Sequence, residues 1–207
     1  MIIDQFLIGT MRNFIYLLTD NGESFVIDPQ RDLKPWETRL QELGSTLRGV
    51  LLTHTHYDHI AGMGETALKY GVPVYVHEHD AFRLKTEAEL KFLKDGEKIK
   101  IGKKEIEVLH TPGHSAGECC YLIRDTKPWS LLTGDTVFVG MVGRTDLETG
   151  SDEEMFETIQ RIKKLPHDTV IYPGHDYGKT PTTTIARQLL EDACFQSRNI
   201  DELREVP

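Results

Sequence analysis

Short apolar runs separated by polar turns make up the first part of the chain. Residues 14–19 and 24–27 are two such runs, and the Asn-Gly turn between them is typical of a β-hairpin. Residues 35–43 instead carry apolar side chains at helical spacing. They lead into residues 47–53, which are apolar and short enough to form a buried strand. This order of strand, helix and strand predicts an α/β fold.

The rest of the chain continues this alternation. We predict further strands at residues 2–8, 72–76, 98–101, 105–110, 118–123, 129–133 and 170–172. We predict helices at residues 60–70, 80–84 and 87–93, and a single amphipathic helix at about residues 184–198. Ser151 and Glu154 form a capping box that opens one more helix, with Met155 and Ile159 on its apolar face.

Side chains that bind metals directly follow the predicted strand 47–53. The segment contains His54, His56, Asp58 and His59. In an extended chain, side chains two positions apart point the same way, so His54 and His56 can face one ion. Asp58 and His59 follow where the chain turns toward the next helix, and they add a carboxylate and a third imidazole. This set of ligands suits zinc, iron or manganese.

Polar side chains also stand at the ends of later strands. His114 follows a Pro-Gly turn between two strands, and loops of this kind often carry functional residues. Asp135 and His175 each follow a glycine directly after a buried strand. Asp28 leaves the strand 24–27, where its carboxylate either orients a ligating histidine or forms a turn. These residues are candidate partners of the first motif.

Two more histidines, His77 and His79, lie in a Val-His-Glu-His-Asp segment that suggests a second metal site. We expect them instead to belong to the polar start of the helix 80–84, because no histidine or carboxylate cluster remains to complete a site. His110, inside its strand, is expected to be an ordinary strand residue. The glycine-rich segment 139–146 does not have the strand–helix pattern of a phosphate-binding loop.

Composition narrows the class of protein. The 207 residues are 39% hydrophobic and can bury a sizeable core, so we expect one domain over residues 1–207. A net charge of −9 argues against a nucleic-acid surface. No apolar run approaches the ~20 residues of a membrane span, and no cleavable leader is apparent. We therefore expect a cytoplasmic protein, with its 3 cysteines as free thiols.

Taken in order, the ligand motifs resemble those of the metallo-β-lactamase superfamily. The resemblance rests on His54-x-His56-x-Asp58-His59, His114, Asp135 and His175. It implies a four-layer αβ/βα sandwich of two mixed sheets, with helices outside and a metal site at one edge. It also implies that His54, His56 and His114 hold a first metal, that Asp58, His59 and His175 hold a second, and that Asp135 bridges the two.

Within that superfamily, Pro112-Gly113-His114, Gly134-Asp135-Thr136 and the segment 173–176 are similar to the glyoxalase II-like branch. This resemblance implies hydrolysis of hydroxyacylglutathione thioesters by a metal-bound hydroxide. The cofactors would be two divalent ions, zinc or iron and manganese, with Asp58 and Asp135 as the catalytic carboxylates. Full-length glyoxalase II carries a separate helical domain that grips glutathione, and we expect at most a small variant of it after His175.

A second branch, the persulfide dioxygenases, is similar at residues 27–32, 143–146 and 175–177. It implies oxidation of glutathione persulfide to sulfite at one Fe(II), which His54, His114 and Asp135 would hold. Arg144 and Tyr177 are the candidate substrate contacts. In this branch Arg144 would take a substrate carboxylate; the alternative is a structural arginine in a surface loop. Tyr57 is more similar to the hydrolases. A metal-binding module without catalytic activity is the third alternative, because fold alone does not give function.

Overall fold

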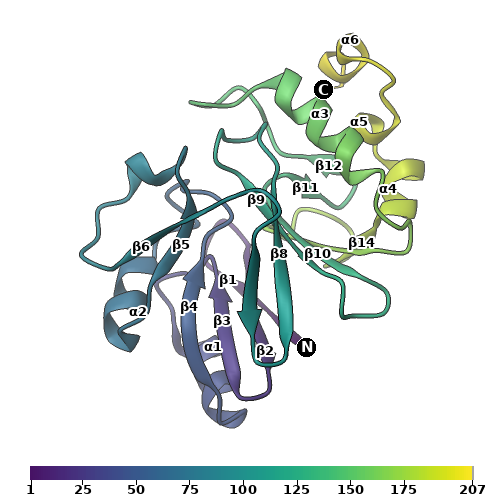
Figure 1. Cartoon of the computed structure of the whole chain (residues 1–207). Coiled ribbons are helices and arrows are strands. Elements are labelled where there is room, and N and C mark those ends of the chain that lie inside the picture. Colours follow the sequence, from purple (N-terminus) through teal and green to yellow (C-terminus); the bar gives the residue numbers. More distant parts are fainter. Residues whose placement is uncertain (207) are drawn as a thin grey trace.

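Two six-stranded sheets form the centre of the molecule, which is described here by a computed structural model covering residues 1–206 (Figure 1). The first sheet contains, in spatial order, β1 (Ile2–Ile8), β2 (Asn13–Asp20), β3 (Glu23–Ile27), β4 (Thr46–Leu51), β5 (Val74–His77) and β6 (Leu90–Leu93). The second contains β14 (Thr183–Thr184), β13 (Val170–Pro173), β10 (Ser130–Gly134), β9 (Cys119–Ile123), β8 (Lys104–His110) and β7 (Lys98–Ile101). A separate hairpin is formed by β11 (Val137–Phe138) and β12 (Met141–Val142).

Both sheets are mixed. In the first, β1, β2 and β3 pair antiparallel, whereas β3, β4, β5 and β6 pair parallel. In the second, β10 and β13 pair parallel, and the other neighbouring strands pair antiparallel. Parallel strands need a crossover between them. The helices α1 (Lys34–Glu42) and α2 (Met63–Tyr70) supply two of these crossovers in the first sheet.

Apolar side chains on both faces of the strands divide the molecule into layers. On β2, Tyr16 and Leu18 face the space between the sheets, while Ile15 and Leu17 pack under the first pair of helices. Trp36 of α1 and Met63 of α2 belong to that outer cluster. A third cluster lies between the second sheet and the helices α3 (Asp152–Ile162), α4 (Ile185–Glu191) and α5 (Ala193–Gln196).

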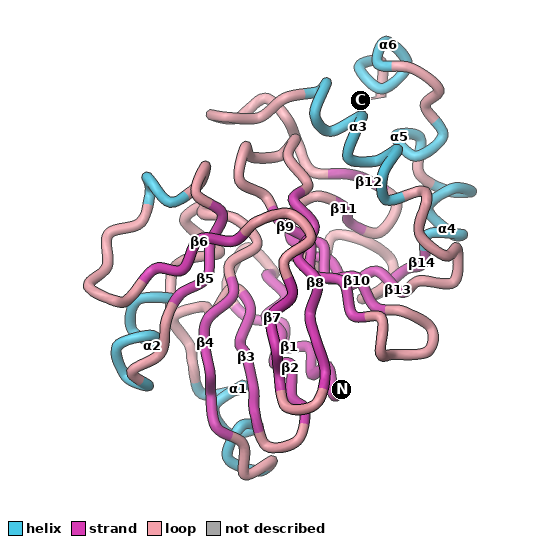
Figure 2. Tube along the Cα trace, in the orientation of Figure 1, coloured by secondary structure: helices cyan, strands magenta, loops and turns pink. Residues whose placement is uncertain are grey.

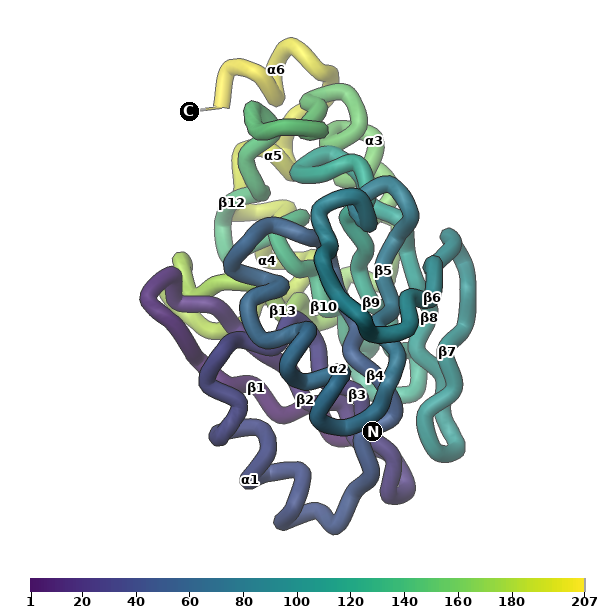
Figure 3. The backbone as a smooth tube through the Cα atoms, turned by 90° about the vertical axis from the view of Figure 1, so that its left-hand side faces the viewer, coloured from purple at the N-terminus to yellow at the C-terminus, as the bar shows by residue number. Residues whose placement is uncertain are grey.

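The layers are therefore helix, sheet, sheet, helix, which confirms the predicted four-layer α/β sandwich. Figure 2 shows the strands at the centre and the helices outside them. In the turned view of Figure 3, α1 lies at one end of the molecule, and α5 and the last helix, α6 (Ile200–Arg204), lie at the other.

Elements that are determined by a few adjacent residues agree with the sequence predictions. The predicted hairpin is formed by β2 and β3, which join at Asn21 and Gly22. The predicted helix 35–43 is α1. The capping residue of α3 is Ser151, whose hydroxyl accepts a hydrogen bond of 3.2 Å from the Glu154 amide. The three cysteines are free and buried, as expected.

Two predicted helices near the middle of the chain are wrong. Residues 90–93 form the strand β6, because the parallel edge of β5 is open and pairs with them from Val74 against Leu90 to His77 against Leu93. This pairing overrides the helical pattern of the charged segment 87–93. The predicted helix 80–84 is reduced to η1 (Ala81–Arg83), a 3-10 turn.

Two further boundaries also differ from prediction. Helix α2 begins at Met63 rather than at residue 60, and Gly62 is its N-cap. Gly62 packs closely on Gln30, because an added Cβ would lie 2.2 Å from the Gln30 carbonyl oxygen. The predicted tail helix 184–198 is divided into short helices. Asp192 has an extended backbone and caps α5 by accepting a bond of 2.8 Å from the Cys194 amide. The strand β14 was not predicted.

Within residues 1–206, no helix is both long enough and apolar enough to cross a bilayer.

Candidate metal centre

The predicted ligands meet at one edge of the two sheets. His54, His56, Asp58 and His59 follow β4 in the first sheet. His114 lies between β8 and β9, Asp135 follows β10, and His175 follows β13, all in the second sheet. Backbone hydrogen bonds join these segments, from the Cys119 amide to the Thr53 carbonyl (2.8 Å) and from the Gly174 amide to the Gly134 carbonyl (2.7 Å).

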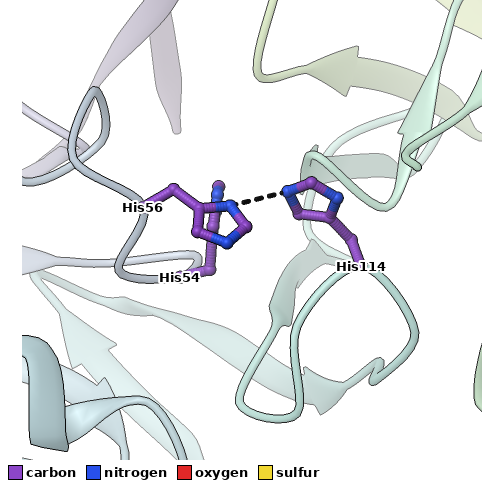
Figure 4. Close-up of side chains that lie close together, drawn as sticks. All are labelled: His54, His56 and His114. Atoms are coloured by element: carbon purple, nitrogen blue, oxygen red, sulfur yellow. Dashed lines mark hydrogen bonds between the residues drawn. The ribbon is translucent and has the colours of Figure 1, made fainter. Parts of the chain in front are cut away.

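Three imidazoles make up the first group of candidate ligands. One nitrogen from each of His54, His56 and His114 lies within 4.8 Å of the others. The Nδ1 atom of His56 is 2.9 Å from Nε2 of His114. Figure 4 shows His54 and His56 on one segment, facing His114 on a different loop. The Nδ1–H of His114 donates to the Arg144 carbonyl at 2.7 Å, so its Nε2 carries the lone pair that faces the group.

The second group consists of Asp58, His59 and His175. His59 donates its Nδ1–H to the Asp28 carboxylate (2.9 Å), and His175 donates its Nδ1–H to the Met11 carbonyl (2.8 Å). Each ring therefore turns its Nε2 atom toward the group, and the two Nε2 atoms are 3.1 Å apart. Two lone pairs at this distance would repel each other, so either a proton or a metal cation must lie between them.

Charge around this second group favours a cation. Burial alone lowers the pKa of His175, but hydrogen bonds that the protonated ring donates to the Asp135 and Asp58 carboxylates raise it to about 9. Burial alone raises the pKa of Asp58, but His175 and His59 lower it to about 2. Asp58 is therefore ionised at neutral pH, and Asn13 donates a hydrogen bond of 2.9 Å to its Oδ2.

Asp135 lies between the two groups. Its carboxylate oxygens are 3.3 Å from Nε2 of His59, 3.6 Å from Nε2 of His114 and 3.4 Å from Nε2 of His175. Asp135 Oδ1 and His54 Nε2 are buried and have no hydrogen-bond partner within residues 1–206. Leaving such groups unpaired costs about 1–3 kcal/mol each. Metal ions would satisfy both atoms, so the donor set fits divalent cations.

Residues outside the predicted ligand set hold the ligands in place. Asp28 accepts hydrogen bonds from the Thr53 amide (2.8 Å) and hydroxyl (2.6 Å) as well as from His59. The two roles considered for Asp28 are thus combined: its backbone turns at φ 49° while its carboxylate orients a histidine.

Glu118 is a supporting residue that sequence reasoning missed. Its side chain is fully buried; Oε1 accepts a hydrogen bond of 3.0 Å from the Asp135 amide, and Oε2 is 3.5 Å from Nδ1 of His54. Asn13, which holds Asp58, was missed in the same way. Neither residue lies within a ligand motif. The only available signal for Glu118 was a charged residue at the start of an otherwise apolar strand.

Comparison with known proteins identifies the family to which this chain belongs. The sequence matches the family described as the metallo-beta-lactamase superfamily over residues 8–175. The chain belongs to this superfamily.

Three similar proteins illustrate its range. The probable polyketide biosynthesis zinc-dependent hydrolase PksB of Bacillus subtilis is 37% identical, over 89% of this chain and 82% of that protein. The hydroxyacylglutathione hydrolase of Hahella chejuensis is 36% identical, over 80% of this chain and 62% of that protein. The crystal structure of ETHE1 from Myxococcus xanthus is 27% identical with a TM-score of 0.87, and the match covers 100% of this chain and 92% of that one.

As in other open metal sites, the ligands border a cavity. The cavity has a volume of about 690 Å³. It is lined by Met11, His56, Tyr57, Asp58, Arg83, His114, Asp135, Phe138, Met141, Val142, Arg144, Leu147, Glu148, His175 and Tyr177. A space of this size accommodates a small organic substrate.

Both predicted substrate contacts line this cavity, but each is already engaged within the protein. The guanidinium of Arg144 makes two bonds of 2.6 Å to the Asp146 carboxylate. The ring of Tyr177 stacks on His175, with ring centroids 4.6 Å apart and planes inclined by 10°. Tyr57, also in the cavity wall, donates its hydroxyl hydrogen bond to the Met11 sulfur at 3.3 Å.

Proposed function

We propose that this chain is a binuclear metal-dependent hydrolase that cleaves thioesters of small thiols, with hydroxyacylglutathione thioesters as the substrate class. One observation carries the proposal. The second ligand group is fully assembled: Asp28, Met11 and Asn13 each orient one of its members, and the Nε2 atoms of its two histidines lie 3.1 Å apart. Such an oriented second group supports a centre of two ions.

His54, His56 and His114 would hold one ion and Asp58, His59 and His175 the other, with Asp135 between them. Zinc, iron and manganese all accept such imidazole and carboxylate ligands. When bound, two divalent ions polarise a carbonyl and lower the pKa of a bound water.

The protein's own groups would orient the reactants. Because the pKa of Asp58 is held near 2, its carboxylate can only accept hydrogen bonds at neutral pH, which orients an attacking water. The leaving thiol has a pKa well below that of an alcohol, so its thiolate can depart without a strong general acid.

The cavity wall supports a substrate with an apolar part and an anionic part. Met11, Phe138, Met141 and Leu147 offer apolar contacts for the acyl group or the thiol sulfur. Arg83 and Arg144 place guanidinium groups in the cavity wall. Glutathione carries two carboxylates, and guanidinium groups pair well with carboxylates. Binding would require Arg83 to exchange Glu148, and Arg144 to exchange Asp146, for the substrate.

The first test measures hydrolysis of a hydroxyacylglutathione thioester. The reaction is monitored by the decrease in absorbance of the thioester. Asp135→Ala should abolish turnover and release metal, because it removes the carboxylate that lies between both ligand groups. Asp168→Ala, in an exposed loop, is the matched control and should behave as wild type. Full activity and full metal content in Asp135→Ala would overturn the proposed site.

The second test separates the hydrolase from the persulfide dioxygenase. His59→Ala removes a ligand of the second ion only and should reduce thioester hydrolysis by at least about 100-fold. Oxygen uptake with glutathione persulfide that persists in His59→Ala would replace the proposal with the single-iron dioxygenase function. If the protein binds metal but turns over neither thioesters nor persulfides, the remaining alternative is a metal-binding module without catalytic activity.

A further inference from the structure

A second cluster of histidines lies outside the metal centre. His77 ends β5 in the first sheet, His79 follows two residues later, and His110 ends β8 in the second sheet. One ring nitrogen from each lies within 4.8 Å of the others. This corrects the expectation that no residue remains to complete a site around His77 and His79. The completing residue, His110, is distant in sequence and is brought there by the packing of the two sheets.

The rings lie close together. Those of His77 and His110 are stacked, with centroids 4.0 Å apart and planes inclined by 6°, so one ring has to rotate before both direct a lone pair at the same ion. The ring of His79 lies 4.8 Å from His77 and 6.0 Å from His110. His77 is buried, His110 is half-buried and His79 is exposed, so the cluster opens to solvent on the His79 side. Three imidazoles with one open side are a common arrangement of zinc ligands.

One of the three rings is oriented so that it presents a lone pair. His110 donates its Nε2–H to the Ala116 carbonyl at 2.8 Å, which leaves Nδ1 unprotonated. The Nδ1 atom of His77 accepts the His79 amide at 3.4 Å, a long and weak hydrogen bond that a metal ion can replace.

We propose that His77, His79 and His110 bind a further divalent transition-metal ion, separate from the catalytic centre. Three imidazole nitrogens suit zinc, cobalt, nickel or copper and suit calcium or magnesium poorly. Because His79 faces solvent, water completes the coordination.

The position of the cluster indicates what such an ion does. Next to it, the buried Asp80 carboxylate accepts hydrogen bonds from the Thr55 amide (3.2 Å), the Ser115 hydroxyl (2.8 Å) and the Gly117 amide (2.9 Å). Those groups belong to the two loops that carry His54, His56 and His114. An ion between β5 and β8 therefore fastens the two sheets beside the catalytic loops and has a stabilising role.

The test is equilibrium dialysis of the intact protein against micromolar Zn²⁺, with bound metal counted per chain. We expect the wild type to bind one equivalent more than His79→Ala, or to bind that equivalent at least about tenfold more tightly. His79 is exposed, so its replacement leaves the fold intact. His167→Ala is the matched control, because His167 is an exposed histidine outside both clusters.

A second measurement follows thermal unfolding of the same proteins as Zn²⁺ is added beyond the catalytic equivalents. The melting temperature of the wild type and of His167→Ala should rise further, and that of His79→Ala should not. Equal stoichiometry and equal zinc-dependent stabilisation in wild type and His79→Ala would overturn the proposal. So would loss of the same equivalent in His167→Ala.

Discussion

His59 shows how a single side chain connects the centre to the fold around it. One ring nitrogen donates to Asp28 and the other faces His175, so the hydrogen bond to Asp28 decides which nitrogen can bind a metal. Asp28 also receives the Thr53 amide and hydroxyl, which fixes the start of the ligand segment after β4. The metal affinity of the second ligand group thus depends on a residue that does not itself bind metal.

Asp28→Asn should lower metal affinity by about 10–100-fold. Asparagine tolerates the positive φ of 49° at this position, so the backbone is preserved. Either orientation of the new amide, however, leaves an N–H group facing another donor, His59 or Thr53. Competition with a chromophoric chelator measures the affinity. Asp168→Asn, on the surface, is the control, and equal affinity in the two variants would contradict the role of Asp28.

At this scale, the sequence shows which residues can be ligands but not which residues support them. The seven candidate ligands could be proposed because their spacing and positions after strands are local features, and the structure brings all of them into adjoining groups. Asp28 could be interpreted in two ways from sequence. Glu118 and Asn13 could not be identified, because their hydrogen bonds to Asp135 and Asp58 cross between strands distant in sequence.

At the scale of elements, helix α3 determines where the His114 loop lies. The Ser151 amide at its start donates to the Gly113 carbonyl at 2.8 Å. Gly113 has φ +145°, and a Cβ there would be 2.6 Å from the Cα of Met155. Only glycine allows this contact. The loop that presents His114 therefore depends on the absence of a side chain one residue earlier.

Gly113→Ala should both destabilise the protein and weaken metal binding, because the loop must move away from α3. Gly22→Ala is a matched control: it has φ +82° but nothing lies within 4 Å of its added Cβ. We expect Gly22→Ala to cost about 1 kcal/mol of unfolding free energy with metal content unchanged. Gly113→Ala should cost more than twice that and lose metal. Denaturant titration and metal analysis measure the two effects, and equal behaviour of the variants would refute the explanation.

Elements were predictable where their causes are local. The Asn21-Gly22 turn and the Ser151 cap identify the hairpin and α3 from a few adjacent residues. The strand β6 was not predictable, because it forms by pairing with β5 and its own sequence favours a helix. The tail was predicted as one helix because the sequence does not show that Asp192 is buried and caps α5. From sequence alone, Asp192 is indistinguishable from a polar residue on the surface of a helix.

At the scale of the whole molecule, the metal centre joins the two sheets. His54, His56, Asp58 and His59 come from the first sheet, and His114, Asp135 and His175 come from the second. Bound ions would therefore oppose separation of the sheets, in addition to any catalytic role. The fold was predictable through its family resemblance, but the histidine cluster at His77 was not, because only the packed sheets bring His110 to it.

Removal of metal with a chelator should lower the melting temperature, and added Zn²⁺ should restore it. An ion that binds only the folded chain adds about 2.7 kcal/mol when its free concentration is 100 times its dissociation constant. Asp135→Ala combined with His79→Ala should show little of this response, because the double variant lacks both proposed metal sites. Differential scanning calorimetry on both proteins is the measurement. An unchanged melting temperature after complete metal removal would show that the ions do not join the sheets.

The most direct test of the binuclear centre is metal content per chain. His79→Ala, purified anaerobically without chelator, retains every ligand of the centre and removes the exposed member of the second histidine cluster. Elemental analysis should give close to two metal ions per chain, zinc or a mixture with iron and manganese. Close to one iron ion per chain would contradict the binuclear hydrolase and favour the dioxygenase.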